Sequence, residues 1–314
     1  MKVIFVASGN KTVGTVSAFV RSQYESLKKE GLEMILFPIK GKGWKHYAKG
    51  ILQLRKLILK EHPDIVHAHY SVCGIVAAIA SIGFSSKVVV SILGSFPRKT
   101  FKLYWVRFFV KYVWDATITK SQRTSDQLGI RLPVIPNGVN LSQFTIVDKN
   151  EARTKLGLQL REKYIIFVSD PARPEKNYSL AELAVKTLKD NTVILKPVFN
   201  KPHCEIVNYM CAGDVLILTS NNEGSPNVIK EAMACNCPIV TTDVGDVRWV
   251  TDGVEGTYVA STYESNEIAQ LLRKALNFPN RTKGREKIVK LGLTTEETAK
   301  RLYKIYSSVI SKQG

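Results

Sequence analysis

Several features that define common protein classes are missing from this 314-residue sequence. No apolar run approaches the roughly 20 residues that a membrane-spanning helix needs. The first eight residues are too short for a signal peptide and predict a buried strand. The five cysteines are odd in number and form no CxxC pair, which excludes an obvious disulfide framework or zinc site. We therefore expect a protein of the reducing cytoplasm.

Acidic residues are scarce in the first half of the chain. Residues 1–140 contain 21 Lys or Arg against 7 Asp or Glu, whereas residues 141–314 contain 24 against 20. This asymmetry predicts an anionic partner for the first half, and nucleic acid, an anionic lipid surface and an acidic saccharide all qualify. Because no nucleic-acid reader module is recognisable, we do not expect nucleic acid as the partner.

The most informative stretch is Asp214–Val244. An apolar run at Val215–Thr219 predicts a strand, the polar segment Ser220–Pro226 a turn, and a helically spaced apolar pattern a helix. Pro238–Thr241 then begins a second buried strand. Such a unit predicts a parallel sheet, in which ligands lie beyond the carboxyl ends of the strands. The N-terminus of the predicted helix favours an anion such as phosphate.

Two carboxylates flank the start of that helix. Glu223 lies in the loop, and Glu231 leans back toward it because helical side chains tilt toward the N-terminus. A phosphate seat between two such acceptors suits a sugar nucleotide, with one carboxylate on sugar hydroxyls and the other on ribose hydroxyls. The alternative is that both are solvated charges at a helix end, where Glu223 is favoured by the helix dipole.

A second loop follows the strand predicted at Tyr164–Ser169. It presents Arg173 and Lys176, which together could neutralise a pyrophosphate, or could instead be two solvated cations. Asn177 can cap the helix that follows.

The segments Glu223-Gly224-Ser225-Pro226 and Glu231-Ala232-Met233-Ala234 resemble the EGxP…EAMA signature of family 4 retaining glycosyltransferases. The resemblance implies the α/β GT-B fold, two Rossmann-like domains facing across a cleft. It also implies a nucleotide-diphosphate sugar as donor substrate, with a UDP-sugar favoured, and no cofactor or metal. Glu223, Lys176 and Arg173 would be catalytic, with Arg173 displaced from the family's usual spacing. The implied donor-binding residues are Glu231, Gly224, Ser225, Pro226, Asn227, Val228 and, in an N-terminal glycine-rich loop, Gly14.

The first half carries the residues that we expect near an acceptor, a saccharide or lipid-linked saccharide. His69 should emerge at the carboxyl end of the strand within 63–70, whereas His67 is expected to be a core histidine. Many family members have His-Gly after the strand at Val88–Leu93. This chain has Leu93-Gly94 instead, so Gly94 and Ser95 are the candidates there.

The predicted domains are residues 1–140, which would bind the acceptor, and 141–294, which would bind the nucleotide sugar. A C-terminal helix at about 295–314 would pack back on the first domain. Leu132–Gly138 resembles the family's interdomain hinge. Only fifteen residues, Phe199–Gly213, separate two strands where relatives spend about twice as many on a segment that contacts the nucleobase. The identity of the base is therefore open.

The segment Phe101–Val113 places an aliphatic stripe on one side of a helix and Phe101, Tyr104, Trp105, Phe108 and Tyr112 on the other. The aromatic side either lies under the C-terminal helix or a loop, or binds an anionic membrane surface beside basic residues. The second alternative predicts a peripheral protein on the inner face of the plasma membrane.

Taken together, the sequence predicts a retaining hexosyltransferase of cell-surface polysaccharide synthesis. Two other functions remain open at this point. A non-hydrolysing nucleotide-sugar epimerase shares the fold but needs dedicated acid and base groups. A non-catalytic sugar-nucleotide-binding partner of another transferase would have no need of both Glu223 and Lys176.

Overall fold

The computed structural model describes residues 1–9, 16–41, 43–94 and 101–311 of the chain. The chain divides into two compact units. Unit 1 comprises Met1–Gly138 and Thr295–Gly314, and unit 2 comprises Val139–Thr294. The boundary between them falls at the end of the segment Leu132–Gly138.

Unit 1 alternates strands and helices. Its elements are β1 (Lys2–Ser8), α1 (Ala18–Lys29), β2 (Glu33–Ile39), α2 (Trp44–Glu61), β3 (Ile65–His69), α3 (Ser71–Ala80), β4 (Lys87–Ile92), α4 (Phe101–Tyr112), β5 (Ala116–Thr119), α5 (Gln122–Leu128) and α13 (Thr295–Ser311).

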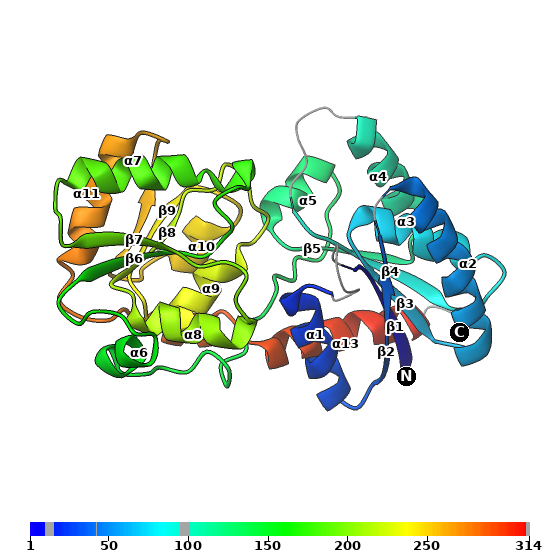
Figure 1. Ribbon diagram of the computed structural model, residues 1–314. Coiled ribbons are helices and arrows are strands. Elements are labelled where there is room, and N and C mark those ends of the chain that lie inside the picture. The colour runs from blue at the N-terminus through cyan, green and yellow to red at the C-terminus, as the bar shows by residue number, and fades with distance from the viewer. Residues whose placement is uncertain (10–15, 42, 95–100, 312–314) are drawn as a thin grey trace. The chain divides into compact units, whose positions relative to one another are not determined.

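The five strands of unit 1 form one parallel sheet in the order β2-β1-β3-β4-β5. Side chains alternate across a strand, so β1 buries Ile4 and Val6 on one face and Val3 and Phe5 on the other. Helices α2, α3 and α4 cover the first face, whereas α1 and α13 cover the second (Figure 1). The last helix of the chain is therefore part of the core of unit 1.

Unit 2 repeats the same pattern. Its elements are α6 (Lys149–Lys155), β6 (Lys163–Phe167), a 3₁₀ turn η1 (Pro174–Lys176), α7 (Tyr178–Leu188), β7 (Val193–Pro197), α8 (His203–Ala212), β8 (Val215–Leu218), α9 (Asn227–Ala234), β9 (Ile239–Thr242), α10 (Val247–Thr251), β10 (Thr257–Ala260), α11 (Ser265–Leu276) and α12 (Gly284–Lys290).

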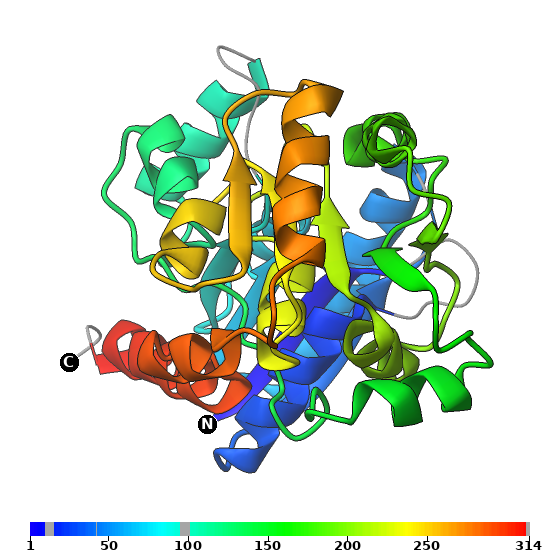
Figure 2. The ribbon, with the colours of Figure 1, turned by 90° about the vertical axis from the view of Figure 1, so that its left-hand side faces the viewer.

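The sheet of unit 2 is also parallel, with strand order β10-β9-β8-β6-β7. Helices α7 and α11 pack on one face; α11 is the orange helix that lies in front of the strands in Figure 2. Helices α8, α9, α10 and α12 pack on the other face. Two Rossmann-like units, each with a five-stranded parallel sheet between helices, confirm the predicted α/β class.

The predicted strands are all found, with ends shifted by one or two residues. For example, the segment Trp114–Thr119, which the sequence predicts as a strand, forms β5 only from Ala116. Trp114 belongs to the turn before it, where its indole nitrogen donates to the carbonyl oxygen of Gly74 at 3.1 Å. Burial of this ring, rather than strand pairing, explains the apolar residue at that position.

Candidate functional site

The stretch 214–244 folds as predicted into a strand, a loop, a helix and a second strand. β8 and β9 pair in parallel, with Leu216 beside Ile239. The loop 219–226 follows β8, so it lies at the carboxyl edge of the sheet, and α9 begins at Asn227. This is the position at which open parallel sheets bind ligands.

An ion pair joins the two residues that were predicted to lie nearest the reaction. The ammonium of Lys176 lies 2.5 Å from Oε1 of Glu223, and the side chains are 17% and 19% exposed. The hydroxyl of Ser220 donates to the same oxygen at 3.0 Å. Each charged group therefore remains within reach of solvent, and an anionic ligand could replace Glu223 as the partner of Lys176.

Backbone and hydroxyl contacts hold the turn that carries Lys176 against the end of β8. Thr219 donates its hydroxyl to the carbonyl oxygens of Lys176 and Asn177, at 3.1 and 2.9 Å. The backbone N–H of Asn221 donates to the carbonyl of Glu175 at 3.0 Å. Lys176 and Glu223 thus come together through β8, although 47 residues separate them in sequence.

Arg173 is not brought to this pair. Its guanidinium donates to Oε1 of Glu175 at 2.9 and 2.6 Å, in an exposed ion pair on its own turn. Its role at the pyrophosphate stays a prediction. The capping role of Asn177 is a correction: it occupies the N-cap position, but its side chain makes no capping bond. Instead it donates to Asn221 and accepts from Ser179, both at 3.2 Å.

Glu231 has a partner that the sequence did not indicate. Oε1 of Glu231 lies 2.9 Å from Nε2 of His203, the first residue of α8. The hydrogen bond to Glu231 raises the pKa of His203, because a nearby carboxylate favours the charged imidazolium. His203 lies in the short segment after β7, and its 28-residue separation from Glu231 leaves no periodic signal for the pair.

A third charged group, Lys230, contacts the loop 219–226 from its buried side. Lys230 is 1% exposed and donates to the hydroxyl of Ser225 at 2.9 Å, while that hydroxyl donates to Asp246 at 2.6 Å. Burial lowers the pKa of Lys230 and raises that of Asp246, and in each case the other charge opposes the shift. Ser225, predicted to bind the donor, is therefore held from the inner side of the loop by a buried lysine and a partly buried aspartate.

Two glycines allow this loop to approach the segment after β9. Gly245 has φ +59°, and a Cβ there would lie 2.5 Å from the carbonyl oxygen of Gly224. Pro226 precedes α9, and Asn227 and Val228 are its first residues. The first turn of α9 contains no acidic residue, which leaves its N-terminus electrostatically suited to an anion.

In unit 1, His69 lies elsewhere than expected. The sequence places it in the open beyond β3, but its ring is fully buried and bonds Gln23 of α1 at 2.8 Å. Burial lowers its pKa to about 3. Its acceptor role stays a prediction. His67 is confirmed as a core residue, since its ring nitrogens bond Tyr306 at 2.5 Å and Ser91 at 2.8 Å.

Of the remaining candidates, Gly94 follows β4 with φ +91°, and its carbonyl accepts from the hydroxyl of Thr124 at 3.3 Å. Gly14 and Ser95 lie outside the described residues.

The aromatic side of α4 is exposed rather than covered. Tyr104, Trp105, Phe108 and Tyr112 are 61%, 51%, 48% and 73% exposed, whereas Leu103 and Val106 on the other side are buried. The alternative in which the C-terminal helix covers these rings is wrong, because α13 packs on the opposite face of the sheet. The side chain of Phe101 lies outside the description.

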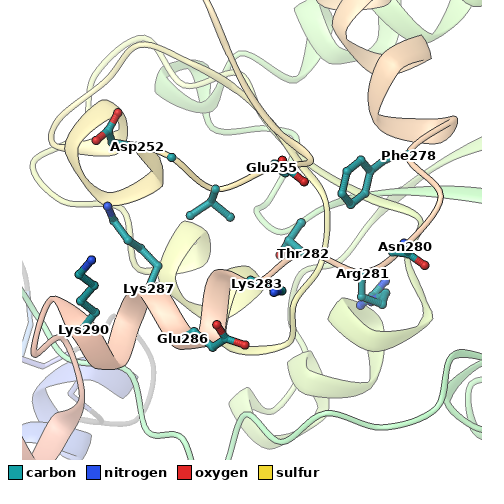
Figure 3. A pocket seen from close by; sticks show the side chains of 12 residues that line it. Asp252, Glu255, Phe278, Asn280, Arg281, Thr282, Lys283, Glu286, Lys287 and Lys290 are labelled. Carbon is teal, nitrogen blue, oxygen red and sulfur yellow. The ribbon is translucent and has the colours of Figure 1, made fainter.

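A separate pocket of about 780 Å³ opens in unit 2 between the turn 252–255 and α12 (Figure 3). Asp252 and Glu255 line it together with Lys287 and Lys290. The turn precedes β10, so this pocket lies at the amino edge of the sheet, opposite the loop 219–226. None of the predicted site residues lines it.

Two further searches cover the described residues alone. They contain no group of three or more His, Cys, Asp or Glu side chains placed to hold a metal ion. No helix among them has both the length and the apolarity that crossing a bilayer requires.

Solved structures with the same architecture are numerous. A sucrose-phosphate synthase of Thermosynechococcus elongatus superposes with a TM-score of 0.80 at 16% identity, over 99% of this chain and 100% of that one. Alr3699/HepE of Anabaena, solved in complex with UDP, gives 0.77 at 16% identity over 98% and 100%. At such identities the likeness shows the fold, and this fold is GT-B.

Sequence comparison adds the family. Residues 6–120 match the model for "Glycosyl transferase 4-like" proteins, and residues 157–277 match that for "Glycosyl transferases group 1". The chain belongs to the family 4 glycosyltransferases.

Two curated relatives come from bacteria. A candidate teichuronic acid biosynthesis glycosyltransferase of Bacillus subtilis, TuaC, is 29% identical over 59% of this chain and 54% of its own length. The UDP-Gal:alpha-D-GlcNAc-diphosphoundecaprenol alpha-1,3-galactosyltransferase of Escherichia coli is 27% identical over 62% of both. The matched stretch thus spans little more than half of each relative.

Proposed function

We propose that this protein is a retaining glycosyltransferase that moves a sugar from a nucleotide diphosphate, with UDP favoured, to a saccharide or lipid-linked saccharide. The observation that carries the proposal is the Lys176–Glu223 ion pair beyond β8, with Glu231 on the adjoining helix. A sugar nucleotide presents phosphates and hydroxyls, which suit a cation and two carboxylates of the protein, respectively.

The chemistry requires the bond between the anomeric carbon and the pyrophosphate oxygen to break. Lys176 and the N-terminus of α9 would stabilise the negative charge that collects on the leaving group, which is the largest single contribution in many enzymes. They would do so without a metal ion. Glu223, released from Lys176, would accept hydrogen bonds from the sugar.

In the proposed mechanism, configuration is retained because the acceptor arrives on the face that the pyrophosphate leaves. The acceptor hydroxyl forms the new bond to the anomeric carbon, and its proton passes to the departing phosphate oxygen. The proposed mechanism therefore uses no covalent nucleophile and no protein base. Support for this step is the family resemblance of the loop 223–226 and of Glu231.

Relatives support the substrate class. TuaC is named for teichuronic acid biosynthesis, and the Escherichia coli relative for transfer from UDP-Gal to a diphosphoundecaprenol-linked sugar. A HepE structure contains UDP-glucose. We therefore place this chain in cell-surface polysaccharide synthesis, with a saccharide on a lipid carrier as the acceptor class.

Incubation with a panel of UDP- and GDP-sugars tests the proposal, with released nucleotide measured as donor hydrolysis. We expect one donor to be turned over, and ¹H NMR of the product formed with a saccharide acceptor to show the donor's anomeric configuration. Glu223→Gln is the matched control, because it keeps the size of the side chain and removes the charge that pairs with Lys176. Absence of binding and turnover for every nucleotide sugar would overturn the assignment.

The lipid carrier suggests where the protein works. The exposed rings of α4 lie on the same face of the sheet as α2, whose outer side lines a groove of about 670 Å³ beside β2. Four lysines line that groove (Lys40, Lys49, Lys56 and Lys60), and no carboxylate does. Exposed aromatic rings and lysines on the same face of one sheet suit an anionic membrane surface. Peripheral binding through this face is the second part of the proposal.

Co-sedimentation with phosphatidylglycerol liposomes tests this second part. Binding should fall with salt and should weaken when Trp105 and Phe108 are both replaced by serine. The control replaces Phe199 and Trp249 of unit 2, which are 42% and 48% exposed, and it should bind like the wild type. A protein that stays in the supernatant at low salt would contradict membrane binding but leave the transferase assignment intact.

A further inference from the structure

His203 holds the Glu231 carboxylate between two helices. It is the first residue of α8, directly after Pro202, and α8 and α9 pack in the same hydrophobic cluster. Its Nε2 lies 2.9 Å from Oε1 of Glu231, and its Nδ1 lies 3.1 Å from Nε2 of Gln143. The ring also packs edge-on against Phe144, with ring centres 5.2 Å apart. The imidazole is therefore held on three sides.

The contacts define the direction of each hydrogen bond. The amide nitrogen of Gln143 is a donor, so Nδ1 of neutral His203 accepts and Nε2 carries the hydrogen that it donates to Glu231. If Nδ1 also takes a proton, the amide of Gln143 can turn to offer its oxygen. The bond from Nε2 to Glu231 is kept in both states.

The rest of the Glu231 carboxylate remains available. Its side chain is 13% exposed, and Oε2 takes no hydrogen bond from the residues that the structure describes. Each carboxylate oxygen has two lone pairs, so Oε1 can accept from His203 and still accept a ligand hydroxyl. A carboxylate whose plane is fixed from one side is preorganised for a pair of neighbouring hydroxyls.

We propose that His203 is a positioning residue for nucleotide recognition, which fixes Glu231 so that its carboxylate receives the two hydroxyls of the ribose. This inference rests on the proposed function, because it takes Glu231 to be the ribose contact. His203 itself touches neither the sugar nor the phosphates. Its contribution is to remove the freedom that Glu231 would otherwise lose on binding.

The electrostatics of the pair favour this role. Among the described residues, Glu231 is the charged group that faces His203 from a neighbouring helix, and Gln143 and Phe144 on the other side are neutral. On α8 itself, the carboxylate nearest to His203 in sequence is that of Glu205. Glu231 raises the pKa of His203, so a larger fraction of the ring is charged near neutral pH than for a free histidine.

The test uses calorimetric titration with UDP and with 2′,3′-dideoxy-UDP, which lacks the two hydroxyls. His203→Ala should weaken binding of UDP about tenfold, the usual effect of losing one charge-assisted hydrogen bond. It should change binding of the dideoxy compound by less than about twofold, since Glu231 then has nothing to receive. His203→Gln, which keeps an N–H donor, should recover most of the affinity for UDP.

Cys204→Ala is the matched control on the same turn of α8, because Cys204 is exposed, and it should bind both compounds like the wild type. An equal loss of affinity for UDP and dideoxy-UDP in His203→Ala would mean a structural role only and would overturn the inference. Unchanged UDP binding in that variant, with Glu231→Ala impaired, would also overturn it. Failure of the proposed function is distinguishable, because then wild-type protein binds neither compound or Glu231→Ala is unimpaired. If His203→Ala does not fold, His203→Asn replaces it in the same comparison.

Discussion

The polar groups at the carboxyl edges of the two sheets are of opposite kinds. In unit 1, His67 and His69 are fully buried and bond neutral partners such as Tyr306 and Gln23. In unit 2, the Lys176–Glu223 ion pair and the His203–Glu231 hydrogen bond join side chains that keep 13% to 34% of their surface exposed. A buried neutral network stabilises a core, whereas partly exposed charges can exchange partners with a ligand.

This difference suggests different roles for the polar residues of unit 1 and unit 2. In unit 2, a ligand phosphate could replace Glu223 as the partner of Lys176, and a ligand hydroxyl could donate to Glu231 beside His203. In unit 1 the same strand-end positions are used for packing, because α1 and α13 close over the histidines. Two units of similar architecture therefore use their polar residues differently, one for packing and the other, under the proposed function, for recognition.

The largest effect is expected where a charge is both buried and part of the site. Lys230→Met removes the buried cation that contacts Ser225 and leaves the partly buried Asp246 without it. We expect the free energy of unfolding of unit 2 to fall by about 3 kcal/mol, the lower end of the range for broken buried pairs, because Asp246 is only partly buried. Hydrogen exchange of α9 peptides in increasing urea measures this. Lys300→Met, which breaks an exposed pair in α13, should leave stability unchanged. If Lys230→Met and Lys300→Met were equally stable, the expectation that the buried charge contributes more to stability than the exposed one would be wrong.

Acidification should separate the two units. Burial lowers the pKa of His67 and that of His69, so the folded state of unit 1 binds fewer protons than the unfolded chain below pH 6.5. Its stability should therefore fall as the pH drops, by on the order of 1 kcal/mol for each histidine at pH 5.5. The raised pKa of His203 acts oppositely, since its stabilisation is complete below pH 6.5 and is lost as the pH rises through its folded value.

Hydrogen exchange of β3 at pH 7.5 and 5.5, corrected for the intrinsic rate, measures the effect in unit 1. His67→Asn cannot take up the proton and should lose about half of the pH dependence. Protection of β3 that does not change with pH would show that these histidines titrate normally.

The two carboxylates of unit 2 should fail in different ways. Glu231→Ala should weaken donor binding, because the helix α9 presents this carboxylate to the ribose, whereas Glu223→Ala should mainly lower kcat. A charged hydrogen bond is worth about 1.5–3 kcal/mol, so each effect should reach roughly 10- to 150-fold. Steady-state kinetics with nucleotide titration separates the two. Normal binding and turnover in both variants would refute the site.

Lys176→Ala should lower kcat/KM by at least about tenfold, equivalent to about 1.4 kcal/mol of transition-state stabilisation. Arg173→Ala is its natural control. Because Arg173 is engaged by Glu175 on an exposed turn, its loss should cost less. Wild-type kinetics for Lys176→Ala, or a larger loss for Arg173→Ala, would reverse the assignment of the phosphate-binding cation.

The strands could be predicted from the sequence because buried parallel strands consist of short, continuous apolar runs. Val215–Leu218 and Val88–Ile92 could be located within a residue, and the EGSP loop followed from the position of its strand. Pairings across long distances in the chain were not accessible. Nothing near His203 indicates Glu231, and nothing near His69 shows that Gln23 covers it.

Local rules also failed where tertiary contacts compete with them. Asn177 has the chemistry of a cap, but its position beside Asn221 gives its side chain another partner. The loop position of Arg173 suggested a cation for phosphate, and the sequence did not show that a glutamate two residues away pairs with it. The Lys176–Glu223 and His203–Glu231 pairs form because the sheet of unit 2 brings distant segments together. Composition and periodicity describe each segment alone and cannot predict such pairs.

The place of α13 in the core of unit 1 has a consequence for biosynthesis. Residues 295–311 leave the ribosome after all of unit 2, yet Leu302, Tyr306 and Val309 fill the face of the unit 1 sheet beside α1. Unit 2 is continuous in sequence and can complete its fold as soon as it has emerged. Unit 1 is synthesised first, but the part of its sheet that α13 covers stays open until residues 295–311 have emerged. Unit 1 therefore closes only after the whole of unit 2 has been synthesised.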